Sequence, residues 1–350
     1  MPSKHKRGKN RANKKKAATP TVLPMVSVCT PTFNRRPFIP YMIRCFRHQD
    51  YPMDRIEWII VDDGTDPIED LIDAANIPNV KYYKLDKKIP LGKKRNLMHS
   101  YTCGDIIVYM DDDDYYPPCR ISHAVETLQK NPAAMCAGSS ILHIYFKHLQ
   151  KVYEFGPYGP RHATAGTFAF RKELLENTAY DDNAAIGEEK VFLKNYTVPF
   201  VQLNPMKVIL VFSHEHNTFD KRKLLIGASP ALVKPTSIHP SAFVKEPDLL
   251  QFYMIDVDDR LSEYAPGRPE MKPDVLENIK KLEKERAEQT QRITMQMGNE
   301  PPRPFTGEEI ASILNSKQME INKLKRLLEV KSRENHMLQV QLHNASDRGW

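Results

Sequence analysis

The 350-residue sequence contains no apolar run that approaches the roughly 20 residues needed to span a bilayer. The basic stretch near its start is not followed by an apolar segment, so it lacks the pattern of a secretory signal. The five cysteines are an odd number without CxxC spacing, which argues against a disulfide framework and against a zinc site. We therefore expect a soluble, cytoplasmic protein with at most peripheral membrane contact.

Positive charge is concentrated at the start of the chain. Residues 4–16 are dominated by Lys and Arg and contain no acidic residue, which is typical of a disordered segment. Such a tail can contact an anionic membrane surface or a nucleic acid, act as a nuclear localisation signal, or only aid solubility. We assign residues 1–20 to this basic tail.

The rest of the chain is long enough for a large domain with appendages. A hydrophobic content of 41% supports a real core. We assign the main domain to residues 21–228 and a charged helical region to residues 274–350. The proline-rich segment between them, residues 229–273, is expected to wrap the core or cover the site.

Strand-like and helix-like segments alternate in the first half of the chain. This alternation predicts parallel βαβ units, and hence an α/β fold with a mostly parallel sheet flanked by helices. Ligands of such sheets bind beyond the carboxyl ends of the strands. The expected strands cover residues 25–30, 58–61, 80–83 and 106–110, and the expected helices cover residues 37–48, 66–75 and 93–101.

Four consecutive aspartates, residues 111–114, directly follow the last of these strands. Four carboxylates repel one another unless a cation lies between them. Oxygen ligands suit Mg²⁺ or Mn²⁺, so we expect one of these ions here. The alternative is a solvated acidic turn that caps the next helix.

Three further polar segments lie at expected strand ends or helix starts: Pro31-Thr32-Phe33-Asn34, Val61-Asp62-Asp63-Gly64-Thr65 and Gly92-Lys93-Lys94-Arg95-Asn96. Together with the aspartates, and in this order, they resemble the motifs of family 2 nucleotide-sugar glycosyltransferases with the GT-A fold. The resemblance covers about residues 26–219. It implies a metal-dependent, inverting hexosyltransferase that moves a sugar from a nucleotide-sugar donor to a hydroxyl of a glycan, protein or small-molecule acceptor.

The donor must be held by a pocket for its base and by positive charge for its phosphates. Asp62 can accept a hydrogen bond from the nucleobase, as the resemblance implies, although an aspartate before Gly64 can also belong only to a turn. The segment that contains Thr32 and Asn34 resembles the one that lies beneath the nucleotide in this family.

Arg95, with Lys93 or Lys94 nearby, supplies positive charge for the phosphates, since its guanidinium suits forked contacts. We place Lys93 with Arg95 in the donor site, and an exposed helix surface is the alternative for Lys94.

Within the aspartate run the resemblance points to a DxD pair formed by Asp111 and Asp113. Asp113 is expected to bind the metal directly. Asp111 is a second candidate ligand and would face the sugar or ribose. We count Asp112 with the donor-binding residues. We expect Asp112 and Asp114 to orient the metal ligands without binding the metal themselves.

Two later segments complete the predicted site. Glu188 and Glu189 resemble the Glu-Asp segment whose second residue acts as general base, so we assign Glu189 as the base and Glu188 as its reserve. Both could instead be ordinary acids in the first turn of a helix. His214 follows an apolar run and resembles a histidine that completes the metal site or contacts the diphosphate.

The C-terminal region carries a heptad pattern over residues 308–344. The Asn at one a position is typical of two-stranded coiled coils, so we predict a homo-oligomer held by this helix. The alternative is a lone helix that packs back on its own domain. The a positions are Leu314, Ile321, Leu328, Asn335 and Leu342, and the d positions are Lys317, Leu324, Lys331, Leu338 and Ala345.

Two other functions compete with glycosyl transfer. A nucleotidyltransferase or pyrophosphorylase also holds a metal with carboxylates, but usually has a glycine-rich loop after the first strand, where this chain has Pro31-Thr32-Phe33-Asn34. A non-catalytic assembly protein would act through its coiled coil and basic tail. The acidic run, Arg95 and Glu189 together favour the enzyme.

Overall fold

The computed structural model describes residues 23–185, 187–292, 294–295, 303–305 and 307–346. The predicted basic tail, residues 1–20, lies outside the described residues.

A seven-stranded sheet forms the centre of the molecule, with the strand order β3-β2-β1-β4-β8-β5-β9. All of its strands share one direction except β8, which runs antiparallel to both β4 and β5. The α/β class with a mostly parallel sheet, predicted from the sequence, is therefore confirmed. The strands are β1 (Val26–Thr32), β2 (Ile56–Asp62), β3 (Val80–Lys84), β4 (Ile106–Tyr109), β5 (Cys136–Gly138), β8 (Ala169–Arg171) and β9 (Phe200–Gln202).

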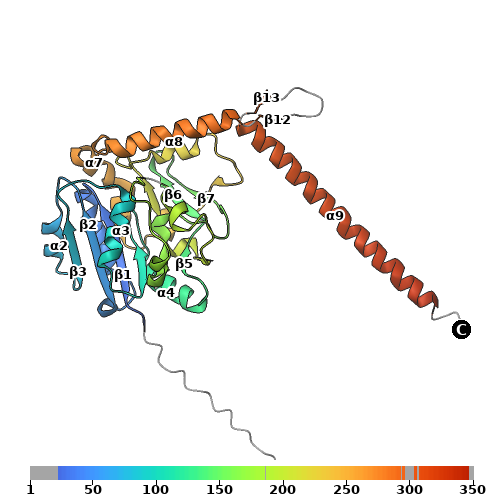
Figure 1. Ribbon diagram of the computed structural model, residues 1–350, viewed down its shortest axis with the longest axis horizontal. Helices are drawn as coiled ribbons and strands as arrows, with labels where there is room; N and C mark the ends of the chain where they lie inside the picture. The colour runs from blue at the N-terminus through green and yellow to red at the C-terminus, as the bar shows by residue number, and fades with distance from the viewer. Residues whose placement is uncertain (1–22, 186, 293, 296–302, 306, 347–350) are drawn as a thin grey trace, which may run out of the picture.

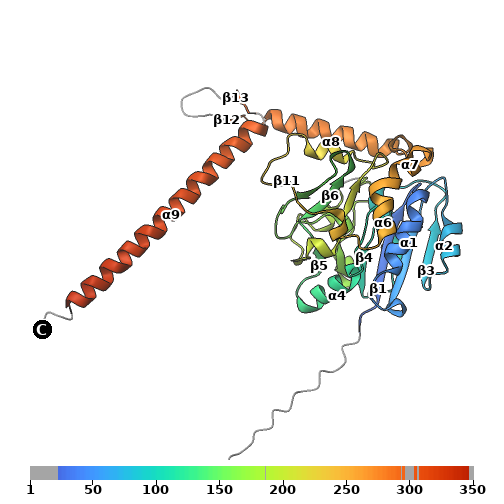
Figure 2. The same cartoon turned by 180° about the vertical axis from the view of Figure 1, so that it is seen from behind.

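Helices cover both faces of this sheet because successive side chains of each strand point to opposite faces. Trp58 and Ile60 of β2 pack in one core, whereas Ile59 and Val61 pack in another. Helix α3 (Leu91–Tyr101) covers the face seen in Figure 1, together with the short α5 (Glu189–Phe192). The opposite face, seen in Figure 2, is covered by α1 (Ile39–Arg47), α2 (Glu69–Ala75), α4 (Arg120–Lys130) and α6 (Pro247–Gln251).

A second, four-stranded sheet was not expected from the sequence. Its order is β10-β6-β7-β11, with β10 at Val211–Ser213, β6 at Leu142–Phe146, β7 at Lys151–Phe155 and β11 at Val233–Pro235. Within the apolar stretch 134–147, Ser139 and Ser140 separate β5 from β6, which belong to different sheets.

The proline-rich segment joins the core of the main domain. Phe252, Tyr253 and Leu261 are buried in the same cluster as β1 and α1. The Tyr253 hydroxyl donates to the backbone oxygen of Asp114, 3.0 Å away, so this segment reaches the aspartate run. It comprises α6, a π-helical turn (Phe252–Asp256) and α7 (Val257–Ser262), with 3₁₀ turns at Pro240–Ala242, Ala265–Gly267 and Pro269–Met271.

Two helices end the chain. Helix α8 (Pro273–Arg292) lies along the domain, whereas α9 (Gly307–Ser346) extends away from it (Figure 1). A short pair of strands, β12 (Thr294–Met295) and β13 (Arg303–Pro304), lies between them. Within the described residues no helix is both long and apolar enough to cross a membrane.

Candidate active site

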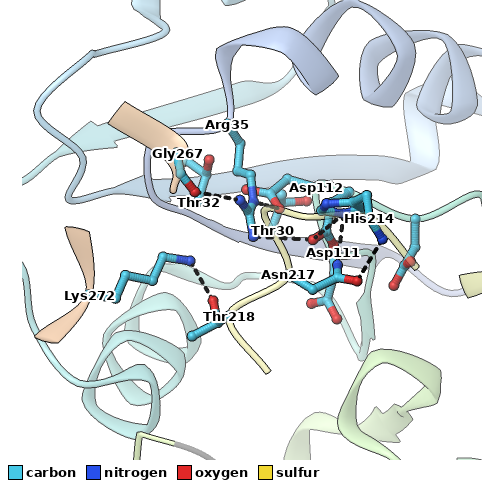
Figure 3. A network of polar contacts seen from close by, with 12 residues as sticks. Thr30, Thr32, Arg35, Asp111, Asp112, His214, Asn217, Thr218, Gly267 and Lys272 are labelled. Atoms are coloured by element: carbon cyan, nitrogen blue, oxygen red, sulfur yellow. Dashed lines mark hydrogen bonds and ion pairs between the residues drawn. The ribbon is translucent and has the colours of Figure 1, made fainter. Parts of the chain in front are cut away.

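The predicted site residues converge at the carboxyl ends of β1, β2 and β4. Parallel pairing sets Thr32 beside Asp62, and the aspartate run begins where β4 ends. Residues from the loops after β1 and β10 and from the proline-rich segment meet these strand ends (Figure 3). The segments that carry the motifs therefore meet at one edge of the sheet.

The four aspartates alternate in exposure. Asp111 and Asp113 are partly exposed, whereas Asp112 and Asp114 are buried. One carboxylate oxygen of Asp114 accepts a hydrogen bond from the Phe212 backbone amide, 3.2 Å away. Burial, followed by the neighbouring Asp113 charge, raises the pKa of Asp114 well above its usual value. Asp111 and Asp113 are thus the two members open to a ligand.

Asp113 is surrounded by positive and imidazole groups. Its Oδ2 lies 3.3 Å from Arg35 Nη2 and 3.3 Å from His214 Nε2. Burial would raise the pKa of Asp113, but Arg35 and His214 outweigh it and hold that pKa well below the usual value. Asp113 is therefore ionised, as a metal ligand must be.

Arg35 was not assigned a role from the sequence, although it directly follows Asn34. It is buried, and its Nε lies 3.6 Å from Asp112 Oδ1. Burial raises the pKa of Asp112 to about 7, with Arg35 acting against the rise. One guanidinium thus neutralises two of the four carboxylates.

His214 lies at the end of β10 with its ring against Phe38, 4.8 Å between centroids. Burial lowers the pKa of this imidazole to about 4, so the ring is neutral and keeps a lone pair. Asn217 lies 2.8 Å from Nε2 and orients the ring. The neighbouring His216 is also buried, and neither of its ring nitrogens has a hydrogen-bond partner in the part of the chain that the structure describes.

The donor set suits a divalent cation, although no group of three or more His, Cys, Asp or Glu side chains among the described residues is close enough to form a ready-made site. Asp113 and His214 are adjacent, and Asp111 Oδ1 is buried without a hydrogen-bond partner within the described chain. Carboxylate and imidazole together fit Mn²⁺, and carboxylates with phosphate oxygens fit Mg²⁺.

Arg95 connects the aspartates to the segment that carries the predicted base. Its Nε lies 3.0 Å from Glu188 Oε1, and its Nη2 lies 3.7 Å from Asp111 Oδ1. The guanidinium is buried and stacks over the Tyr109 ring at 4.4 Å. Neither of these ion pairs could be read from the sequence, because Arg95 and Glu188 belong to distant segments.

Glu189, the predicted base, begins α5 and is partly exposed. Its Oε1 accepts a hydrogen bond from the Ala165 backbone amide, 3.1 Å away. Burial, followed by the nearby Glu188 charge, raises the pKa of Glu189 to about 7. Glu188 is the buried partner of Arg95, so the two glutamates have different surroundings.

A cavity of about 910 Å³ opens beside the end of β2. Asp63 lines it, together with Phe33, Gly64 and residues of the proline-rich segment such as Met271. Asp62 lies next to it with both carboxylate oxygens engaged, one by the Gly64 amide at 2.8 Å and one by the Tyr82 hydroxyl at 2.7 Å. The cavity thus lies where the donor base was predicted, with Asp63 on its wall.

Other residues that were predicted to bind the donor form hydrogen bonds and ion pairs with other groups of the protein. Asn34 has a left-handed backbone (φ 52°), and its side-chain amide bonds Thr65 and the Pro266 carbonyl. The Thr32 carbonyl accepts a hydrogen bond from Lys94 Nζ at 2.8 Å, and Lys94 also pairs with Asp63. Lys93 is exposed on α3, whereas Lys94 is buried, so Lys94 is the lysine that reaches the strand ends.

Lys272 was also missed by the sequence analysis. Its Nζ donates to Thr218 Oγ1 at 2.8 Å and lies 5.4 Å from the Phe33 ring centroid (Figure 3). Burial, followed by repulsion from Arg35, lowers the pKa of Lys272 to about 7. No local sequence pattern indicates that this lysine is a site residue, because only the folding of the proline-rich segment brings it to the site.

Comparison with known proteins agrees with the motifs. Residues 27–184 match the family model described as glycosyl transferase family 2. The glycosyl transferase WcaA of Escherichia coli is 33% identical over 102 residues, which cover 28% of this chain and 36% of WcaA. The poly(ribitol-phosphate) β-N-acetylglucosaminyltransferase TarS of Staphylococcus aureus is 30% identical over 92 residues, covering 25% of this chain and 16% of TarS. The chain thus spans about a third or less of these relatives' lengths.

Solved structures with similar folds include a mannosyltransferase from Pyrobaculum calidifontis in complex with GDP-Man and Mn²⁺. It has a TM-score of 0.47 and 17% identity, covering 72% of this chain and 76% of that one. TarS residues 1–349 in complex with UDP-GlcNAc have a TM-score of 0.44 and 15% identity, covering 81% of this chain and 99% of that one. The domain that contains residues 27–184 thus matches glycosyl transferase family 2, and it has an α/β fold.

Proposed function

We propose that the protein is a metal-dependent, inverting glycosyltransferase that moves a sugar from a nucleotide-sugar donor to an acceptor hydroxyl. The observation that carries this proposal is the position of Arg95, whose guanidinium contacts both Asp111 and Glu188. This contact holds the predicted donor-binding aspartate and the predicted base segment around one residue, as a transfer between two substrates requires. A screen of nucleotide-sugar hydrolysis and transfer with Mn²⁺ or Mg²⁺ tests it directly.

In this proposal the donor lies along the strand ends. Its base occupies the 910 Å³ cavity beside Asp63, and its diphosphate lies toward Asp111 and Asp113. Arg35, which contacts Asp113, and Lys272, whose Nζ donates to Thr218, are available to contact the phosphates. Lysine and arginine are the usual phosphate ligands among side chains.

Asp113 and His214 would hold the cation, with Asp111 near them and the remaining positions left to the diphosphate. When bound, a divalent cation stabilises the charge that grows on the leaving diphosphate. The chain supplies the ionised carboxylate and the neutral imidazole that this requires.

Glu189 would take the proton from the acceptor hydroxyl as its oxygen attacks the anomeric carbon opposite the leaving diphosphate. The Ala165 amide holds one carboxylate oxygen in place. A base with a pKa near 7 is well matched to proton transfer at neutral pH. In-line attack of this kind inverts the anomeric configuration.

The rate of transfer should therefore depend on pH through Glu189. Its pKa is raised to about 7, so the carboxyl group becomes protonated as the pH falls through 7, and a protonated base cannot accept a proton. We expect kcat to fall about tenfold for each pH unit below that value. Initial rates at saturating donor between pH 5.5 and 8.5 measure it. A rate that stays level down to pH 5.5 would remove Glu189 as the base.

We further propose that α9 forms a homo-oligomer through a coiled coil. Its apolar seam is exposed in the structure: Leu324 is 58% exposed and Leu328 is 72% exposed. The helix extends away from the domain, so the domain does not cover this seam (Figure 2). Glu320 and Lys325 occupy g and e positions of the heptad, where opposite charges pair between parallel strands.

Introducing a charge into the seam should therefore change the oligomeric state. We expect Leu324→Glu to lower the mass in solution toward that of a monomer, whereas Val330→Glu, at an exposed c position outside the seam, should leave it unchanged. Light scattering on these variants, and on a chain that ends at residue 297, measures the masses. Equal masses for wild type and Leu324→Glu would contradict the coiled coil.

Contacts of the basic tail with an anionic membrane or a nucleic acid, and a cytoplasmic location, stay predictions from the sequence. The nature of the donor sugar and of its nucleotide is left to the transfer screen.

A further inference from the structure

A row of three rings lies beside the predicted base. The ring centroids of Tyr158 and His162 are 5.0 Å apart, and those of His162 and Tyr196 are 5.1 Å apart. Tyr158 is 45% exposed, and His162 and Tyr196 are partly exposed. Large aromatic residues usually bury their rings in the core, so a row of rings open to solvent marks a surface available for binding.

The loop that carries two of these rings also contacts the predicted base. His162 lies in the loop that continues to Ala165, whose amide holds the Glu189 carboxylate. Burial raises the pKa of the Tyr196 phenol, and the Glu189 charge raises it further, so Tyr196 lies within electrostatic reach of the base. The His162 loop and Tyr196 therefore both lie near the predicted proton acceptor.

The loop that carries Tyr158 and His162 is held firmly. The Gln202 side-chain amide donates to the carbonyls of Pro160 and His162, both at 3.0 Å, and its oxygen accepts from the Ser140 amide at 2.8 Å. Gln202 therefore fastens the loop to β9, which belongs to the main sheet. The rings are thus presented on a prearranged support.

Tyr196 is presented by an unusual backbone. Lys194, Asn195 and Tyr196 have φ values of 49°, 55° and 61°, a left-handed conformation that residues other than glycine rarely adopt. Such strained conformations cluster at functional sites because the surrounding structure must maintain them. Three in succession, ending at a ring beside Glu189, set this turn apart from an ordinary loop.

A cavity of about 400 Å³ adjoins Tyr158 at the far end of the row. It is lined by polar and small residues as well as by the ring, among them Ser139, Ser140 and Gln202. The volume lies within the range of small-molecule sites.

We propose that this ring row and cavity bind the acceptor, and that the acceptor is a carbohydrate. A sugar ring has two faces lined by C–H groups and a rim of hydroxyl groups. Its C–H groups fit against the electron-rich faces of Tyr158 and Tyr196, and its rim hydroxyls meet the polar cavity wall. This inference rests on the proposed function, because it places the acceptor hydroxyl at Glu189.

Direct binding of sugars tests the proposal without any donor or turnover. We expect saturation-transfer NMR to detect binding of at least one of three probes, cellotetraose, chitotetraose and maltotetraose, to the full-length protein. Tyr158→Ala should weaken that binding about tenfold or more. Tyr196→Asn should do the same, since Asn tolerates a left-handed backbone but lacks the ring.

Two matched variants guard against a general effect. Tyr158→Phe keeps the ring and should bind within about twofold of wild type. Leu149→Ala removes a side chain of similar exposure, 44%, outside the ring row, and it should also leave binding unchanged. Binding of none of the three probes by wild type, or unchanged binding by Tyr158→Ala, overturns the proposal.

Kinetics separates this inference from the proposed function. If transfer is found, the ring variants should raise the acceptor KM while the rate of donor hydrolysis by water stays unchanged, and an unchanged acceptor KM overturns the inference alone. If no nucleotide sugar is ever consumed but the sugars bind at the ring row, the proposed function fails and the carbohydrate site stands.

Discussion

Asp113→Asn is expected to abolish transfer, lowering kcat by about 1000-fold or more, and to remove the metal dependence of nucleotide binding. Asp113 is partly exposed and ionised, and it lies 3.3 Å from His214. Asparagine keeps its shape but loses the charge that would hold a cation against the diphosphate. Calorimetry with UDP and GDP, with and without Mn²⁺, measures the affinity while the melting temperature reports on folding.

The next residue supplies a matched control. Asp114 is buried, has a raised pKa, and uses an oxygen to accept from the Phe212 amide. Asparagine retains an accepting oxygen, so Asp114→Asn should leave Mn²⁺-dependent nucleotide binding within about threefold of wild type. A folded Asp113→Asn protein with unchanged metal-dependent affinity would show that the cation, if one binds, is held elsewhere.

Glu189→Gln is expected to retain donor binding and to lose transfer by about 10²–10⁴-fold in kcat. The amide has the size of the carboxyl group and can still accept from the Ala165 amide, but it cannot take a proton. Single-turnover rates at saturating donor and acceptor, with donor affinity measured separately, check both parts.

Glu188→Gln distinguishes a base from a residue that positions others. Glu188 is the buried partner of Arg95, and glutamine keeps an accepting oxygen but removes the negative charge that balances this guanidinium. We expect weaker donor binding and lower thermal stability from this variant, with its pH profile retained. Equal transfer rates for Glu189→Gln and wild type would move the base to Glu188 or outside this segment.

The strand-end motifs predicted the place of the site because parallel strands bring their carboxyl ends to one edge. The resemblance also pointed to Asp111 and Asp113 as the pair that meets the ligand, although residues 112–114 form bends rather than an extended strand. The exposure of each pair agrees with this expectation.

Local patterns did not distinguish Lys93 from Lys94. Consecutive helical residues point about 100° apart, so the choice depends on where α3 begins and how it packs on the sheet. The structure exposes Lys93 and buries Lys94 against Asp63. The same dependence on packing applies to the two aspartates after β2. The motif predicted Asp62 as the residue that binds the nucleobase, whereas Asp63 lines the cavity.

The sequence alone determined the α/β class and the match to the family model, and it predicted the edge of the sheet where the candidate site lies, because each depends on short-range patterns: strand and helix alternation, and polar residues directly after buried strands. Tertiary structure alone decided which distant side chains meet there. Arg95 contacts Glu188, Arg35 contacts Asp113, and Lys272 reaches Thr218 because helices and loops pack on both faces of one sheet. Such contacts depend on three-dimensional packing across segments far apart in the chain, which no local pattern encodes.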